Sequence, residues 1–271
     1  MTRRVKNALL TVAAWSGIGA LLAFLIIPAF VVFVVSLNST DSLTFPPRGF
    51  SLRWYERALN YPEFQAAFTN SVVVALAASL IALLVGSACA YLLDRYEFPY
   101  KGALEGTLSS PLIIPHFTTG FGFLLLGASL GVMSTFAPVV ATHVVLVTPF
   151  VIRSIYVSLR NIDRDFERAA ANLGASPGAV LFRITLPLLA PGLIGGWMFA
   201  VILSLTEFTA SLFVTVHQTR TLPVAMFHYI RNYTDPTVAA ISAVLIVATA
   251  LLMILANKFL GLNRILSIRD A

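Results

Sequence analysis

NALLTVAAWSGIGALLAFLIIPAFVVFVVSLNST, residues Asn7 to Thr40, contains no Lys, Arg, Asp or Glu. A helix that crosses a membrane needs about 20 mostly apolar residues, because lipid cannot satisfy free backbone N–H and C=O groups. The stretch exceeds this length, so we expect it to form a membrane-spanning helix. A secretory signal fits less well, because its apolar region is only about 7–15 residues long.

Four further uncharged stretches follow the first: Phe64–Leu93, Gly106–Ile152, Ile184–Thr206 and Pro236–Asn257. Gly106–Ile152 is long enough for two helices, and the turn-prone residues Gly127–Pro138 are the natural place to divide it. The sequence therefore predicts an all-α membrane protein that forms a single domain over residues 1–271. Its six transmembrane helices are expected at about 10–36, 67–92, 104–127, 137–156, 191–214 and 237–258.

Composition and charge agree with a membrane location. Of the 271 residues 58% are apolar and 11% are charged, about half the charged share of an ordinary soluble domain. With six spans, thirteen Lys and Arg residues fall on the side of both termini and five on the other side. The positive-inside rule then predicts a multi-pass membrane protein with both termini in the cytoplasm. The basic residues are scattered over loops and form no single patch, so nucleic acid is not expected as a partner. The apolar runs make the lipid bilayer the expected surroundings.

The external loop at about 38–66 is expected to carry a short interfacial helix at Leu52–Leu59. Trp54 and Tyr55 would lie at the level of the lipid headgroups, where amphipathic aromatic rings gather.

The cytoplasmic loop at 157–190 is the longest on its side, and its pattern predicts two short helices. Ile162, Phe166, Ala169, Ala170 and Leu173 recur at helical spacing. Asp163 can cap this first helix, and Gly174 is placed to end it. Ser176 can cap a second helix that starts at Pro177 and is expected to end at Leu186-Pro187. A loop that serves only as a connection has about 2–8 residues, so this segment is either an extended surface loop or a docking element.

One pattern in this loop resembles the "EAA" loop of binding-protein-dependent ABC permeases: Glu167-Arg168-Ala169-Ala170-Ala171-Asn172-Leu173-Gly174-Ala175-Ser176, followed by Ile184-Thr185-Leu186-Pro187. In that family Glu-Ala-Ala, three residues, Gly, nine residues and Ile-x-Leu-Pro follow one another. The chain departs at the glutamate, because Arg168 occupies the family position and Glu167 stands one residue earlier. The resemblance implies the MetI-like transmembrane domain of a type I ABC importer, located in the bacterial inner membrane.

The resemblance also implies the partners and the energy source. Two copies of a cytoplasmic ATP-binding subunit, a second permease subunit (an identical or a sister chain) and an extracytoplasmic solute-binding protein would complete the importer. The chain has no Gly-x-x-x-x-Gly-Lys-Ser/Thr phosphate loop, so we expect the partner subunit to use the ATP. No catalytic residue, cofactor or metal is expected in this chain. The residues expected to couple to the ATPase are Phe166, Glu167, Arg168, Ala169, Ala170, Leu173, Gly174, Ala175, Ser176, Leu186 and Pro187.

Glu207 is the acidic residue inside the predicted fifth span. Helical spacing would place Ser204 and Ser211 on its face, and an ionisable group within a span is by default a pathway hypothesis. In the predicted third span, prolines and glycines imply a kinked or unwound helix. We expect a solute pathway lined by Glu207, Ser204, Thr206, Ser211, His116 and Thr119. Structural roles remain alternatives for Glu207 and His116, and for His143 a structural role is favoured.

Within the family, the chain resembles the second permease subunit of spermidine/putrescine-type importers. The resemblance lies in Ser-x-x-Glu-Phe at 204–208, Thr221-Leu222-Pro223 and Asp235-Pro236-Thr237. It implies a polyamine or a related small cationic amine as the solute. Relatives that carry 2-aminoethylphosphonate or ferric iron share much of this pattern and remain alternatives. A self-sufficient secondary transporter is the alternative of another class, but it would need its own coupling-ion sites and ideally an internal repeat.

Overall fold

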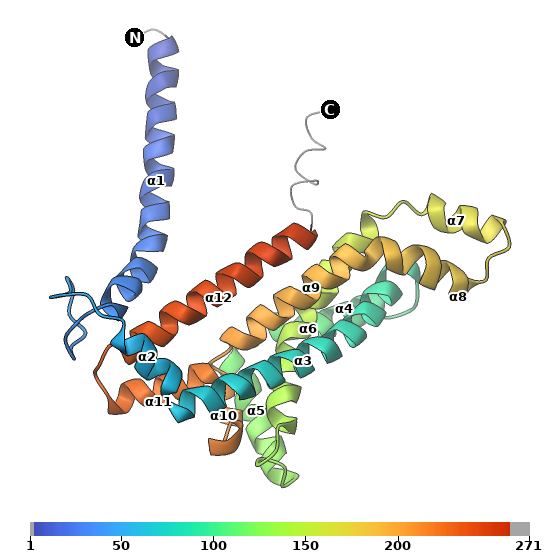
Figure 1. Cartoon of the computed structure of the whole chain (residues 1–271). Coiled ribbons are helices and arrows are strands. Elements are labelled where there is room, and N and C mark those ends of the chain that lie inside the picture. The colour runs from blue at the N-terminus through green and yellow to red at the C-terminus, as the bar shows by residue number, and fades with distance from the viewer. Residues whose placement is uncertain (1–2, 261–271) are drawn as a thin grey trace. The chain divides into compact units, whose positions relative to one another are not determined.

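The computed structural model describes residues 3–260, which form helices joined by turns and short loops (Figure 1). Within this range the only β-type pairing is an isolated bridge between Asn38 and Phe50. Two of the charges used for the predicted orientation, Arg264 and Arg269, lie outside the described residues. The α-helices are α1 (Arg3–Ser36), α2 (Arg53–Asn60), α3 (Pro62–Arg95), α4 (Lys101–Ser109), α5 (His116–Ser129), α6 (Ala137–Arg160), α7 (Asp165–Asn172), α8 (Pro177–Val180), α9 (Leu186–Thr206), α10 (Ser211–Val214), α11 (Leu222–Asn232) and α12 (Thr237–Leu260).

Five segments of the described chain are helices long and apolar enough to cross a membrane: Leu10–Ser36, Pro62–Arg95, Ala137–Arg160, Pro177–Thr206 and Thr237–Ala256. A sixth arises if Lys101–Leu112 and His116–Ser129 are counted as one broken span, since they meet at an angle of 97°. The kink expected in the predicted third span at 104–127 is therefore confirmed, and it is sharp enough to divide the span into two helices.

The break in that helix has a local cause. Pro115 adopts an extended conformation with φ −56° and ψ 135° immediately before α5. Proline has no N–H to give to the preceding turn, and it disfavours helical geometry in the residue before it. The helix therefore stops before Pro115 and restarts in another direction at His116.

The described chain divides into two compact units. The larger comprises Glu63–Phe227 with the end of α12, and the smaller comprises the segment up to Pro62 with His228–Val247. In the larger unit α3, α6 and α9 share a core in which Ala82, Val151 and Ala200 are fully buried. Gly86 lets α3 and α6 approach closely, because an added Cβ would lie 2.9 Å from a Val151 methyl carbon. Small residues at such contacts are a means of packing helices tightly in membranes.

In the smaller unit, α2 confirms the predicted short helix, with its start and end shifted by one residue. The Trp54 side chain is buried within the chain, and its Nε1–H donates to the carbonyl of Asn38 at 2.6 Å; its expected headgroup level stays a prediction. Tyr55 makes a 2.6 Å hydrogen bond to Ser36. The indole N–H needs a partner when it is buried, and the loop after α1 supplies one.

The loop between α6 and α9 starts as predicted. Asp163 accepts a hydrogen bond from the backbone N–H of Asp165, and Gly174 has the left-handed φ of 87° expected after a helix. Ser176 caps α8 by accepting from the backbone N–H of Ala179 at 3.3 Å.

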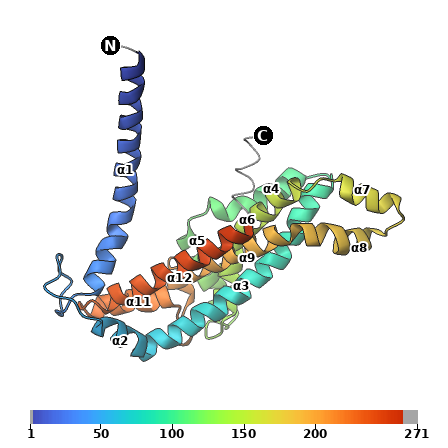
Figure 2. The same cartoon turned by 45° about the horizontal axis from the view of Figure 1, so that its top comes forward.

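The predicted end of the second helix at Leu186-Pro187 is wrong. A π-helical segment, Leu181–Thr185, joins α8 to α9, so the helix continues from Pro177 to Thr206 as one rod in Figures 1 and 2. The Leu186 N–H bonds to the carbonyl of Leu181, five residues back. Such a wide turn accommodates Pro187, which has no N–H and whose ring would crowd a regular helical turn.

Candidate functional site

The other end of α9 is broken at Glu207. The fifth span was expected to run to residue 214 as one helix, but Glu207 is extended with ψ 121° and a new helical turn, α10, starts at Ser211. The Glu207 carboxylate accepts hydrogen bonds from the backbone N–H groups of Ala210 (Oε1, 3.0 Å) and Ser211 (Oε2, 2.9 Å). An acidic side chain in this position acts as a cap, which favours a break over a continued helix.

His143 fixes the two sides of this break. The side chain is buried on α6, with Nδ1 2.6 Å from the Ser204 hydroxyl and Nε2 2.8 Å from the Ser211 hydroxyl. These serines do not share a helix face with Glu207, so that part of the prediction is wrong. His143 has the structural environment that the sequence favoured for it, since both ring nitrogens have partners within the chain.

α5 approaches the break from a third direction. His116, its first residue, lies with Nδ1 3.4 Å from Glu207 Oε1. Further along α5, a Cβ added to Gly120 would lie 2.7 Å from the Ala210 backbone. Only a residue without a side chain fits such an approach, so Gly120 brings the α5 backbone against the segment between α9 and α10.

A cavity of about 230 Å³ opens beside the Glu207 carboxylate. It is lined by His116, Leu146, Val147, Phe150, Leu203, Thr206, Glu207, Phe208 and Thr209. Of the predicted pathway residues, the structure brings Glu207, His116 and Thr206 together here. Thr119 instead lines a separate cavity of about 330 Å³ with Thr118 and Phe123, and Ser204 and Ser211 bind His143. A carboxylate with an aromatic and aliphatic wall can pair with a small organic cation.

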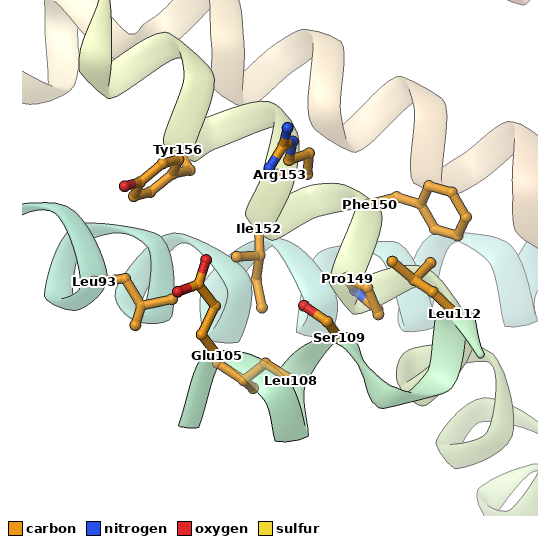
Figure 3. Close-up of a pocket in the computed structure, with 10 residues that line it drawn as sticks. All are labelled: Leu93, Glu105, Leu108, Ser109, Leu112, Pro149, Phe150, Ile152, Arg153 and Tyr156. Atoms are coloured by element: carbon orange, nitrogen blue, oxygen red, sulfur yellow. The ribbon is translucent and has the colours of Figure 1, made fainter. Parts of the chain in front are cut away.

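A third cavity, of about 300 Å³, was missed by the sequence reasoning (Figure 3). Glu105 reaches into it from α4, opposite Ile152, Arg153 and Tyr156 of α6. Phe150 lines this cavity and the one beside Glu207. A signal was available, because Glu105 and Arg153 are the two charges that flank the uncharged run Gly106–Ile152.

The predicted coupling residues lie around α7 and the glycine turn. Phe166 is 59% exposed and Leu173 is 89% exposed. Arg168 points outward and pairs with the exposed Asp165 at 3.1 Å. Ala169, Gly174, Ser176 and Pro187 are also exposed, and Ala170, Ala175 and Leu186 are half-buried.

Glu167 behaves differently from the rest of α7. Its carboxylate turns inward, 2.8 Å from the Arg95 guanidinium and 2.7 Å from the Thr185 hydroxyl. The displaced glutamate therefore has its ionic partner within this chain.

The family model described as "Binding-protein-dependent transport system inner membrane component" matches residues 82–261. The chain belongs to this family. It is a permease subunit of an ABC importer with the MetI-like fold, and it is a multi-pass membrane protein.

Curated relatives extend the similarity over most of the chain. The spermidine/putrescine transport system permease protein PotC of Haemophilus influenzae is 31% identical over 87% of this chain and 91% of that protein. The putrescine transport system permease protein PotI of Escherichia coli K12 is 30% identical over 91% of this chain and 90% of that protein.

Solved structures agree on the fold. A bacterial ABC transporter chain involved in alginate import superposes with a TM-score of 0.71 at 18% identity, covering 95% of this chain and 98% of that chain. The MetNI methionine ABC transporter in an inward-facing conformation gives 0.60 at 16% identity, covering 72% of this chain and 93% of that chain. At these identities the likeness concerns the architecture alone.

Proposed function

We propose that this permease subunit carries a small cationic amine of the polyamine class and is driven by a cytoplasmic ATPase. The observation that carries the proposal is the Glu207 carboxylate, which lies at a helix break beside a cavity. The PotC and PotI relatives belong to spermidine/putrescine and putrescine transport systems, which supports the same solute class.

The bonds that Glu207 makes leave it able to bind an ammonium group. Each carboxylate oxygen can accept about two hydrogen bonds. One backbone N–H occupies each oxygen, and His116 lies 3.4 Å from Oε1. An ammonium group donates three hydrogen bonds, and Thr206 and Thr209 on the cavity wall offer further acceptors.

The exposed apolar residues of α7 support a docking role. Phe166 on α7 and Leu173 immediately after it are exposed, and the small alanine side chains of α7 let another protein approach its backbone closely. This suits insertion into a groove of an ATPase subunit. Two such subunits, a second permease subunit and an external solute-binding protein complete the proposed assembly. ATP would bind only to the partner subunits, this chain would hold no cofactor, and both termini would face the cytoplasm.

One observation favours a second solute. Glu105 and Arg153 line the same cavity of about 300 Å³, and a zwitterion such as 2-aminoethylphosphonate carries one group for each of them. No observation in the described residues favours ferric iron over the amines.

Uptake by the complete importer in proteoliposomes tests the proposal. Labelled putrescine should enter only with internal ATP, external binding protein and the ATPase subunits present. Excess 2-aminoethylphosphonate should not compete. If uptake survives ATP depletion and the chain never co-purifies with an ATPase subunit, the chain is instead a self-sufficient transporter.

A further inference from the structure

An ionic cluster lies at the end of α3 that faces α7. Its members come from four parts of the chain: Asp94 and Arg95 from the end of α3, Arg160 from the end of α6, Arg164 and Glu167 from the start of the loop, and Thr185 from the π-helical segment. We call these six residues the ionic joint.

The inner half of the ionic joint is centred on Asp94. Its side chain is 1% exposed and contacts the Arg95 guanidinium. Arg164 donates to the Asp94 carboxylate at 3.2 Å and to its backbone carbonyl at 3.0 Å, and Arg160 lies 3.4 Å from the other carboxylate oxygen. A buried charge is tolerated only when it is paired in this way. The end of α3 is therefore held to the segment that leads from α6 to α7.

The outer half of the ionic joint reaches α7 itself. Arg95, 9% exposed, pairs with Glu167, 16% exposed, at 2.8 Å, and the buried Thr185 donates to the same Glu167 oxygen at 2.7 Å. One carboxylate oxygen thus connects α7 with α3 and with the residue immediately before α9. This arrangement differs from the exposed ion pair of Asp165 and Arg168 on the same helix.

The connection to α9 extends to the Glu207 cavity. α9 has 21 residues, which corresponds to about 30 Å of helix. Thr185 stands at its start, and the break at Glu207 follows its end. A displacement of α7 passed on through Glu167 and Thr185 therefore acts on a helical rod that ends at the candidate solute site.

From this geometry we infer that Glu167 is a positioning residue. It transmits the movement of α7 to α3 and α9 through Arg95 and Thr185, and it does not itself bind the ATPase. The inference rests on the proposed docking of α7 on an ATPase subunit. The exposed residues Phe166 and Leu173, which would make that contact, are not part of the ionic joint. It assigns to the displaced glutamate a role inside the permease.

The test compares Glu167→Gln with Asp165→Asn in the complete importer reconstituted in proteoliposomes. Both variants remove one negative charge from α7, but Asp165 is 76% exposed and outside the ionic joint. ATPase co-purification, ATP hydrolysis stimulated by loaded binding protein, and amine uptake are measured on each. In Glu167→Gln the ATPase should stay bound, while the amine transported per ATP hydrolysed should fall about tenfold, within the usual range of coupling between sites. Asp165→Asn should keep the wild-type ratio.

Thr185→Val provides an independent variant, because it removes the hydroxyl and leaves both charges in place. Its ratio of transport to hydrolysis should also fall, and the double variant with Glu167→Gln should be no worse than the more affected single variant. An unchanged ratio in Glu167→Gln, or fewer assembled complexes with the ratio preserved in those that remain, would overturn the inference. If the wild-type chain binds no ATPase, the proposed function itself fails, and this outcome is distinct from the others.

Discussion

The charge of Glu207 is the most direct test of the solute pathway, and Glu207→Gln is the variant that isolates it. Glutamine has nearly the same shape, and its amide oxygen can still accept a hydrogen bond from one of the two N–H groups at Ala210 and Ser211. The negative charge is lost, and so is one acceptor of the cap.

The size of the effect follows from the contact that is removed. A hydrogen bond to a charged group contributes about 1.5–3 kcal/mol, and about 1.4 kcal/mol corresponds to a factor of ten. Amine uptake should therefore fall about ten- to a hundredfold. Losing a cap costs about 1 kcal/mol of helix stability, so the folded complex should persist.

Initial rates of labelled putrescine uptake into proteoliposomes measure this effect. Glu105→Gln is the matched control, because it neutralises the carboxylate of the neighbouring cavity, which shares Phe150 with the Glu207 cavity. The yield of assembled complex and its thermal midpoint are determined for both variants.

Two outcomes would refute the reasoning. If Glu207→Gln takes up the amine at the wild-type rate, the carboxylate serves only as a cap. If uptake falls only in proportion to a loss of assembled complex, the role of Glu207 is likewise structural. A fall of the same size in Glu105→Gln would assign the effect to the negative charge of both cavities together.

Three further changes test other parts of the structure. Gly174→Val should reduce ATPase co-purification, because φ 87° is strained for a β-branched residue. Gly174→Asn should retain ATPase co-purification, and equal binding by both variants would contradict the importance of the turn. Gly120→Ala should lower the thermal midpoint and uptake, since the new methyl carbon would lie 2.7 Å from Ala210 backbone atoms, and a wild-type midpoint would show that α5 moves aside at little cost. Burial raises the pKa of Asp235, but hydrogen bonds from Thr237 and Tyr229 and the nearby Arg57 outweigh burial, so the pKa lies below its ordinary value of 3.8. The stability that Asp235 contributes is present above this value and is lost as the pH falls through the lower pKa of the folded state. Asp235→Asn should therefore flatten the decline of the thermal midpoint at acid pH, whereas an unchanged decline would assign it to other groups.

Much of the architecture could be predicted from the sequence because it depends on local properties. In lipid, an uncharged run of about 20 residues satisfies its backbone N–H and C=O groups by forming a helix, so the membrane class followed from the composition and length of these runs. The turn at Gly174 and the cap at Ser176 were predictable because each depends on a residue and its immediate neighbours.

The continuation of the helix through Pro187 and its end before Glu207 could not be predicted from local rules. Pro187 was expected to end a helix, but the π-helical turn before it accommodates a residue that has no N–H to donate. Glu207 was expected to continue one, but its carboxylate caps the next turn instead. In both places the local preference has more than one solution, and packing in the larger unit selects among them.

The sequence by itself therefore determined that this chain crosses a membrane and carries, between two of its spans, a short helix followed by a glycine turn. Only the tertiary structure decided which polar groups meet. His143 reaches serines 61 and 68 residues away, and Arg95 reaches Glu167 72 residues away. The physical reason is that a charged or hydrogen-bonding side chain signals in the sequence only that it needs a partner, whereas the packing of α3, α6 and α9 determines which partner is within reach.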